Sequence, residues 1–397
     1  MKKILYKLLI IFLILSLIFI IILSTIGIET NKFNNLISNK INQTNNNINL
    51  KLNSIKFKVD IEELSLFLET KNPTVFYRDS SIPAKNIKVY LDFISLIKTE
   101  TKIKKINLIL SQIEVNKLKE ISNSFKPSNF KSFVKNKILE GSLNTEIEIF
   151  LDENNLFKDF IAKGSFSNFK AKTFENLILT NTNFDFFADK SDVLIKNIFG
   201  ELSFLKIKDG DLKIKLSPEI EINSNFISDI KFNKQTKIDT NFFNKYSYFS
   251  NLTNFTGTTN NSFFLIFDKT YKVKNYDITS NGKISSLNFV NKIFQNNEFL
   301  PEKINLISIA EADLKTSFTP KQSNINVVGS YSANESDFLD FKVENSTNNQ
   351  STKIYINAEF DKELNLEAIN FKKPKDIIAK FNLDFEKNKK ELIINNM

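Results

Sequence analysis

The residues from Leu8 to Ile28 form an apolar stretch without a single charged side chain, and no other feature constrains the fold of this chain as strongly. Leu, Ile and Phe make up most of the stretch. As a helix that rises about 1.5 Å per residue, it is long enough to cross the roughly 30 Å hydrocarbon core of a bilayer. The sequence therefore predicts a transmembrane helix that holds the rest of the chain at a membrane.

Charged residues on either side of this stretch indicate its orientation. Lys2, Lys3 and Lys7 precede it, and Glu29 follows it. Positive residues near a membrane span are retained on the cytoplasmic side. We therefore expect a single-pass protein with its N-terminus in the cytoplasm and the bulk of the chain on the far side of the membrane.

A cleaved signal peptide is the alternative interpretation of the same stretch. Signal peptides have an apolar region of about 7 to 15 residues that ends in a small-x-small cleavage site. This stretch is longer, and its end, from Ile22 to Gly27, offers only weak cleavage sites. We therefore expect an uncleaved anchor.

The residue types that the chain lacks restrict its chemistry. The chain contains no His and no Cys, which excludes the usual structural zinc sites, Ser-His-Asp hydrolysis and thiol chemistry. Its glycines form none of the motifs G-x-x-x-x-G-K, G-x-G-x-x-G and G-x-S-x-G. Carboxylate or lysine chemistry stays open, but the adjacent Glu62 and Glu63 would point to opposite faces of a strand. We predict a non-enzymatic protein without a cofactor or a metal site.

The net charge of +9 raises the question of nucleic-acid binding. The basic residues are nearly all Lys, are scattered along the chain and are interleaved with Asp and Glu, so they form no basic patch in the sequence. The predicted orientation also separates the bulk of the chain from nucleic acid. We expect no nucleic-acid partner.

An alternation of apolar and polar residues recurs from Ile48 almost to the C-terminus, which is typical of strands with one apolar face. A one-residue slip near Ser54 interrupts the first run and predicts a β-bulge there. Asn, Asp, Gly and Lys between the runs suit hairpin turns. The clearest apolar positions are Leu143, Ile147, Ile149, Leu212, Ile214, Leu216, Ile354, Ile356 and Phe360.

A short segment after the membrane span has helical spacing instead. Residues 30–42 predict an amphipathic helix whose apolar positions are Phe33, Leu36, Ile37 and Ile41. The polar residues that follow it end the helical pattern.

Two further segments, 115–124 and 128–140, predict a helical pair docked on the sheet. Pro127 can open the second helix of the pair, and Gly141 can end it. The plain role of such a pair is to cover part of the sheet.

About twenty short strands with one apolar face form a sheet that must curl, split or close, because strongly twisted sheets rarely exceed about ten strands. Two architectures are possible, one that covers the apolar face and one that leaves it open to a ligand. In a β-sandwich, a second sheet of the same chain packs on it. In an elongated, curved antiparallel sheet, the inner face stays available to lipid acyl chains as a groove. The alternation alone does not choose between them.

The order of features in the first part of the chain favours the groove. A Lys cluster, an apolar helix and an amphipathic segment are followed by Asn72–Phe76 (NPTVF), Ile82–Asp92 (IPAKNIKVYLD), Lys104–Leu108 (KKINL) and a helical pair that ends in Glu140–Leu143 (EGSL). This order resembles the N-terminal part of AsmA-like proteins, the family that includes TamB. The resemblance covers about residues 1–143, and beyond them it depends on strand periodicity.

The resemblance implies a periplasmic protein of a Gram-negative bacterium, anchored in the inner membrane and built as an apolar β-groove. Members of the family are thought to conduct phospholipids towards the outer membrane or to assist outer-membrane assembly. We therefore expect a cytoplasmic tail and anchor over residues 1–29, an AsmA-like region over 30–142 and elongated groove repeats over 143–397. Acyl chains of a phospholipid would contact the nine apolar strand positions named above.

A second functional class stays open at this point. A periplasmic scaffold or chaperone would assist the assembly of outer-membrane proteins through exposed strand edges, by β-augmentation. Such a scaffold predicts a bound protein partner and no stoichiometric lipid, whereas a lipid carrier predicts bound phospholipid.

The mass of the intact protein isolated from membranes tests the anchor. We expect a chain that retains residues 1–28, because the apolar stretch lacks a good cleavage site. A mature chain that begins near Ile28 would show instead that the stretch is a cleaved signal peptide.

Overall fold

A computed structural model describes residues 2–31, 34–35, 38–39, 47–63, 65–92, 102–154, 156–173, 177–234, 251–268, 272–290, 300–367, 370–375, 377–388 and 391–396. Strands hold 67% of the chain, and helices are few. This confirms the prediction of a mostly β chain with an N-terminal apolar helix, a curved antiparallel sheet and a short helical pair.

The chain divides into two compact units. Unit 1 comprises residues 1–171 and 185–191, and unit 2 comprises residues 172–184 and 192–397. Unit 1 includes strand β9 (Ile138–Leu151), most of which sequence patterning assigned to the groove repeats. It belongs to unit 1 because it pairs with β7 (Ile103–Leu110) on one side and with β10 (Phe157–Lys172) on the other.

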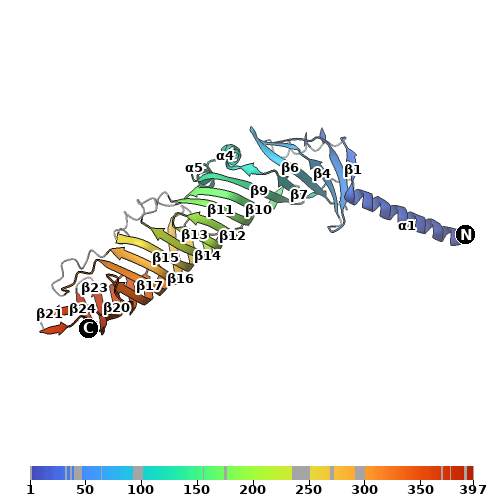
Figure 1. The fold of residues 1–397 in the computed structure, drawn as a ribbon. Coiled ribbons are helices and arrows are strands. Elements are labelled where there is room, and N and C mark those ends of the chain that lie inside the picture. The colour runs from blue at the N-terminus through green and yellow to red at the C-terminus, as the bar shows by residue number, and fades with distance from the viewer. Residues whose placement is uncertain are drawn as a thin grey trace. The chain divides into compact units, whose positions relative to one another are not determined.

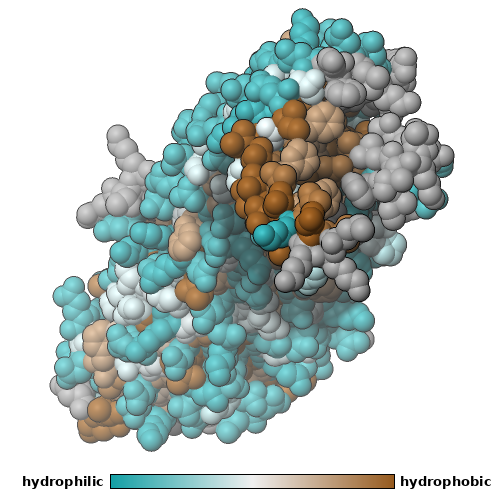
Figure 2. Space-filling model, turned by 90° about the vertical axis from the view of Figure 1, so that its right-hand side faces the viewer, coloured by the Kyte–Doolittle hydropathy of each residue, from teal (hydrophilic) through white to brown (hydrophobic). Residues whose placement is uncertain are grey.

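Helix α1 (Lys2–Thr25) is the predicted membrane segment. Residues Ile4–Thr25 are long and apolar enough to cross a membrane, and none of the most apolar part is buried. In Figure 1, α1 projects from the sheet of unit 1, and Figure 2, viewed from that side, shows a dense brown cluster of apolar surface. By length and composition, α1 is a membrane anchor or a signal sequence.

The C-terminal end of α1 is set by Gly27. The backbone N–H groups of Ile26 and Gly27 both donate to the carbonyl oxygen of Ile22, at 2.9 Å each. Gly27 has a φ of 74°, in the left-handed region that commonly ends helices. The helix therefore stops at Thr25, before the predicted limit at Ile28, and the chain enters strand β1 (Ile28–Thr30).

Unit 1 is built on an antiparallel sheet. β1 pairs with β3, β3 with β4, β4 with β6, and β6 with β7, while β9 lies between β7 and β10. The short β8 also pairs with β9. The bounds not yet given are β3 (Ile55–Asp60), β4 (Ser65–Lys71), β6 (Ser80–Leu91) and β8 (Ile113–Glu114).

A second layer covers one face of this sheet. Strand β2 (Ile48–Lys51) pairs with β5 (Thr74–Tyr77), which pairs with the first residues of β6. Leu50 and Val75 from this layer join Leu68 and other residues of the main sheet in one buried apolar cluster. This part of unit 1 is therefore two-layered, as in the sandwich alternative.

The predicted bulge near Ser54 is wrong. β2 ends at Lys51 and β3 begins at Ile55, and the two strands pair with different partners. Leu50 and Ile55 nevertheless belong to the same buried cluster. The one-residue break in the apolar alternation near Ser54 exists because the chain crosses between two layers at this point.

Helices α4 (Val115–Asn123) and α5 (Asn129–Asn136) confirm the helical pair. The hydroxyl oxygen of Ser128 caps α5 by accepting a hydrogen bond from the backbone N–H of Lys131 at 3.1 Å. Gly141 does not end α5, contrary to the prediction. It lies inside β9 with a φ of 132°, and a Cβ there would come within 2.7 Å of the Phe166 ring.

Little of the predicted amphipathic helix over residues 30–42 is described. Residues 34–35 and 38–39 are helical, and Thr30 belongs to β1. Phe33, Leu36, Ile37 and Ile41 lie outside the described residues.

Unit 2 is a run of long antiparallel strands that pair in chain order, from β12 to β20 and then through β23 to β24. Figure 1 shows these strands side by side, from green to red. Their bounds are β12 (Asp192–Leu202), β13 (Leu205–Lys215), β14 (Ile220–Asn233), β15 (Leu252–Phe267), β16 (Val273–Val290), β17 (Leu306–Phe318), β18 (Gln322–Ala333), β19 (Leu339–Asn348), β20 (Ser351–Phe360), β23 (Ala379–Asn388) and β24 (Leu392–Asn396). β21 (Leu364–Leu366) and β22 (Phe371–Lys373) form a separate small hairpin, and residues 178–184 of β11 (Ile178–Asp189) also belong to unit 2.

Bulges bend several strands of unit 2 near their middles. The register slips at Lys208 in β13, at Ser285 in β16 and at Glu311 in β17. Asn197 in β12 and Glu311 have positive φ values, of 55° and 51°. A bulge bends its strand and increases the local twist. These positions lie close together across the register, so they curve the sheet along one line.

Truncation of Leu68 is expected to destabilise unit 1. Leu68 is 8% exposed in the core between the two layers, and Leu68→Ala should cost about 2–5 kcal/mol because packed methyl groups are lost. Amide hydrogen exchange of β4 and β6 in the full chain measures the effect. Lys71→Ala, at the exposed end of the same strand, is the control. Unchanged protection in Leu68→Ala would contradict a two-layered core.

Candidate functional site: the inner face of unit 2

The antiparallel registers assign each side chain of unit 2 to one of two faces, because successive residues of a strand alternate. We call the face that carries Leu212 the inner face and the face that carries Lys213 the outer face. Register pairs such as Ile214 with Ile222 extend the inner face from strand to strand. Its half-buried apolar side chains are Leu212, Ile214, Ile222, Phe263, Leu265, Ile278, Leu314, Val327, Val343, Ile354, Ile356, Leu383 and Phe385.

Unit 2 leaves this inner face partly open. A packed core residue of unit 1, Ile55, is 1% exposed, whereas the inner-face side chains named above are only half-buried. Other inner-face residues are buried, because Ile230, Phe232 and Ile284 are 8%, 5% and 5% exposed. Among the described strands of unit 2, the β21–β22 hairpin alone lies outside the single long sheet. A contiguous apolar surface of this kind marks a binding site or an interface.

The outer face is polar and carries ion pairs between strands. Lys215 pairs with Glu221, and Lys353 with Glu386, each at 3.4 Å and each in direct register. Lys208 lies 2.8 Å from Asp229. Its hydrogen bond, aided by one from Thr258, holds the pKa of the Asp229 carboxyl below its ordinary value. The ion pairs lie on the outer face, although that face also carries apolar side chains such as Phe264 and Ile266.

Small residues form the floor of the inner face where the bulges bend the sheet. The floor consists of Ser228, Gly257, Thr259, Gly282, Ala312 and Gly329. Ala312 is 0% exposed, and a Cβ on Gly329 would lie 2.4 Å from the Ala312 Cβ. A Cβ on Gly282 would lie 2.2 Å from the Thr258 carbonyl oxygen. Larger side chains do not fit, because neighbouring backbones approach closely here.

A neutral polar group interrupts the apolar surface beside this floor. Asn261 donates from Nδ2 to Thr259 Oγ1 at 3.1 Å and to Ser228 Oγ at 3.4 Å. Its Oδ1 accepts a hydrogen bond from the Ser280 hydroxyl at 2.6 Å. These contacts satisfy the amide within the chain and add no charge to the inner face.

Five of the nine predicted groove residues lie on the inner face of unit 2. They are Leu212 and Ile214 on β13, and Ile354, Ile356 and Phe360 on β20. Leu216 follows the end of β13 at Lys215 and is 43% exposed, so it does not continue the row.

The other three, Leu143, Ile147 and Ile149, lie on one face of β9 in unit 1. Ile147 pairs with Leu108, and Ile149 pairs with Ile106. Leu108 and Ile106 pack against the buried two-layer core. In unit 1, this apolar face is therefore continuous with a covered core.

Sequence patterning missed most of the inner face between β14 and β19. In β15, polar residues occupy both faces from Thr256 to Ser262, which hides the period of two. Phe263 and Phe264 follow as neighbours on opposite faces. The register settles the assignment, since Phe263 pairs with Ser224 and its ring meets that of Phe226 edge to face at 6.1 Å.

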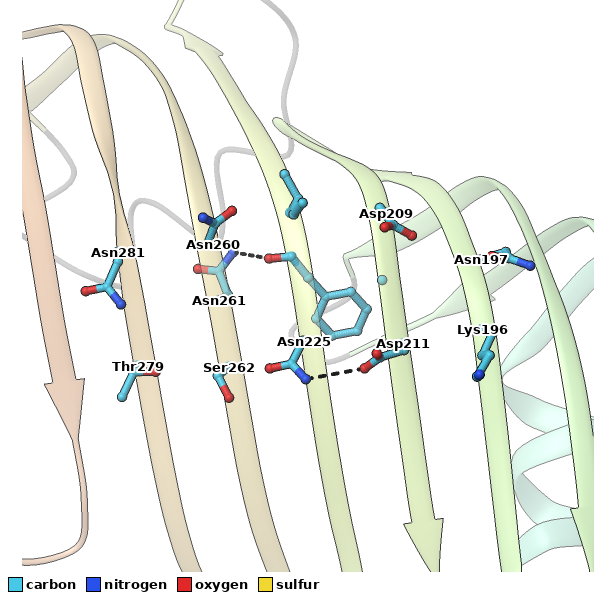
Figure 3. Close-up of a pocket in the computed structure, with 13 residues that line it drawn as sticks. Lys196, Asn197, Asp209, Asp211, Asn225, Asn260, Asn261, Ser262, Thr279 and Asn281 are labelled. Carbon is cyan, nitrogen blue, oxygen red and sulfur yellow. Dashed lines mark hydrogen bonds between the residues drawn. The ribbon is translucent and has the colours of Figure 1, made fainter.

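A shallow polar hollow of about 440 Å³ lies across β12 to β16, as Figure 3 shows. Its outer-face side chains include Asp211, Asn225, Ser262 and Thr279 in one row across four strands. Asn225 donates from Nδ2 to Asp211 Oδ1 at 3.4 Å. Nothing in this lining pairs a nucleophile with a base, and the described residues hold no group of three His, Cys, Asp or Glu side chains able to bind a metal.

Comparisons with family models, with curated proteins and with solved structures give no match to this chain. The AsmA-like resemblance therefore stays an expectation. The proposed function therefore rests on the geometry of the inner face.

Enlarging the floor is expected to disrupt unit 2. Ala312→Leu adds a branched side chain at a position that is 0% exposed, and overpacking of this kind costs about 1–3 kcal/mol or more. The neighbouring Asp313→Leu points to the exposed outer face and is the matched control. Hydrogen exchange of β16 to β18 should speed up in the first variant only. Equal protection in both would show that the floor is not tightly packed.

Proposed function

We propose that this protein is a membrane-anchored, non-enzymatic lipid carrier whose inner face holds the acyl chains of a phospholipid. The observation that carries the proposal is the half-buried apolar face of unit 2, which continues from β13 to β23 without a second sheet over it among the described strands. Acyl chains would complete the burial of these side chains, and the polar headgroups would face the solvent.

The hydrophobic effect supplies the driving force. Removal of apolar surface from water is worth about 25 cal/mol per Å², or about 0.8 kcal/mol for each buried CH₂ group. Both the acyl chain and the inner-face side chains gain from the contact. Specific hydrogen bonds are not required, so a chain of lipid length can slide along the face.

The AsmA-like resemblance suggests the setting in which this would occur. In that setting, α1 anchors the protein in the bacterial inner membrane through residues 8–28, and the remaining chain lies in the periplasm. The phospholipid would then be conducted towards the outer membrane.

One observation favours the scaffold alternative. All five residues of β24 are exposed, and they include Leu392, Ile393 and Ile394 at 59%, 41% and 57%. An apolar strand at the margin of a sheet invites β-augmentation by another polypeptide. An outer-membrane assembly protein is the partner that this alternative implies.

Charge placed on the inner face is expected to abolish lipid binding. Ile354→Asp combined with Ile356→Asp puts two carboxylates against the acyl chains, which strongly disfavours contact with hydrocarbon. Mass spectrometry of organic extracts from detergent-free protein measures the bound lipid. The matched control is Tyr355→Asp combined with Asn357→Asp, on the outer face of the same strand. Equal lipid content in both double variants would contradict the proposal.

Photocrosslinking separates loss of binding from loss of folding. A photoreactive phenylalanine analogue at position 263 keeps the inner-face aromatic ring, and the same analogue at position 264 lies on the outer face. We expect crosslinks to phospholipid from position 263 and few from position 264. No lipid crosslinks from position 263, or equal lipid crosslinking from both positions, would contradict the proposal.

A further inference from the structure

The passage from α1 to the sheet of unit 1 has no flexible linker. Only Ile26 and Gly27 separate the helix from β1. A Cβ on Gly27 would lie 2.7 Å from the Phe57 carbonyl oxygen and 2.8 Å from the Lys58 Cγ. The end of the helix is therefore packed against β3, and only glycine fits at this point.

Pairing with β3 fixes the chain as soon as it leaves the helix. Ile28 pairs with Phe57, and Thr30 pairs with Ile55. Between them, Glu29 lies 3.5 Å from Lys56 in an exposed ion pair. The first strands of the sheet are thus held directly at the end of the apolar helix.

The turn between β3 and β4 lies at the same end of β3 as the start of β1, where the chain enters from α1. Because β1 and β3 are antiparallel, the residues after Phe57 extend past the start of β1 at Ile28. Ile61 lies four residues beyond Phe57, or about 13 Å at about 3.3 Å per residue. The turn therefore extends back from the start of β1, in the direction from which the chain enters that strand.

The junction and the β3–β4 turn both carry exposed apolar side chains. Ile26, Ile28 and Ile61 are 66%, 49% and 54% exposed. Asp60 shapes the turn, because its Oδ1 accepts hydrogen bonds from the backbone N–H groups of Glu62 and Glu63 at 3.1 Å each. Ile61 is the first residue of this turn, directly after the end of β3 at Asp60.

We infer that the β3–β4 turn is a second membrane contact, in which Ile61 enters the surface of the bilayer that α1 spans, beside Ile26 and Ile28. The inference rests on the anchoring role of α1 in the proposed function. Its occupant is a lipid bilayer surface, because Ile26 and Ile28 directly follow the apolar α1 and the β3–β4 turn extends back beyond Ile28. Apolar side chains at a headgroup boundary gain from partial burial there.

Carboxylates limit the depth of this contact. Asp60, Glu62 and Glu63 flank Ile61, and Glu63 is paired with Lys105. Charged groups are costly in the hydrocarbon core and acceptable among headgroups. The contact is therefore shallow, and it holds the first strands of the sheet at the surface where acyl chains become accessible.

Single-tryptophan depth measurements test the inference, since the chain contains no native Trp. Full-length Ile61→Trp is reconstituted into phosphatidylcholine vesicles whose lipids carry bromine at known depths. We expect a blue-shifted emission that shallow bromines quench more than deep ones. Phe338→Trp, exposed at a site in unit 2, is the unquenched control, and Phe19→Trp reports on α1 itself. Ile28→Trp gives a second position at the junction.

The outcomes separate this contact from the anchor. Quenching of Phe19→Trp without quenching of Ile61→Trp or Ile28→Trp would overturn the inference and leave the anchor intact. No quenching of Phe19→Trp would remove the anchor, and the inference with it. A flexible Gly-Ser insertion after Gly27 should reduce quenching of Ile61→Trp but not of Phe19→Trp, because the short junction is what holds the turn at the surface.

Discussion

One constraint governs this structure: a sheet with one apolar face must cover that face or leave it for a ligand. Unit 1 covers it, because the layer that carries Leu50 and Val75 packs on the main sheet. Unit 2 bends instead. Bulges such as those at Lys208 and Glu311 bend the strands, and a large part of the inner face stays half-buried. Half-burial reduces the water contact of an apolar side chain without removing it, which leaves apolar surface for a ligand to cover.

Features that depend on local chemistry were predictable from the sequence. The uncharged run from Leu8 to Ile28 predicted α1, since a lipid-exposed backbone must satisfy its own hydrogen bonds and a helix does so within one segment. Alternation placed Leu212 with Ile214, and Ile354 with Ile356, on common faces, because side-chain direction alternates along any strand. Neither prediction required knowledge of a distant partner. The function assigned to these faces remains a prediction.

Features that depend on distant partners were not predictable. A β-bulge and a crossing between layers shift parity by the same single residue, so the pattern from Leu50 to Ile55 cannot separate them, and only the pairing of β2 with β5 does. Leu216 keeps the parity of β13 after the strand has ended. Glycine is common at helix ends, so Gly141 suggested the end of a helix. It lies inside β9 instead, where a Cβ would come too close to the Phe166 ring. Each of these outcomes is set by pairing over long sequence separations.

The same alternation leads to a covered core in unit 1 and a partly open face in unit 2, and small residues at the bend are one difference between them. Packed sheets lie about 10 Å apart because large side chains from both inner faces interdigitate. Along the bend, the floor of unit 2 offers only Gly257, Gly282 and Gly329 beside Ala312, so a second sheet would find few side chains to interdigitate with along this line. These glycines also let neighbouring backbones approach closely at the bend. Small residues along the bend are therefore a feature of unit 2 that the apolar alternation alone does not predict.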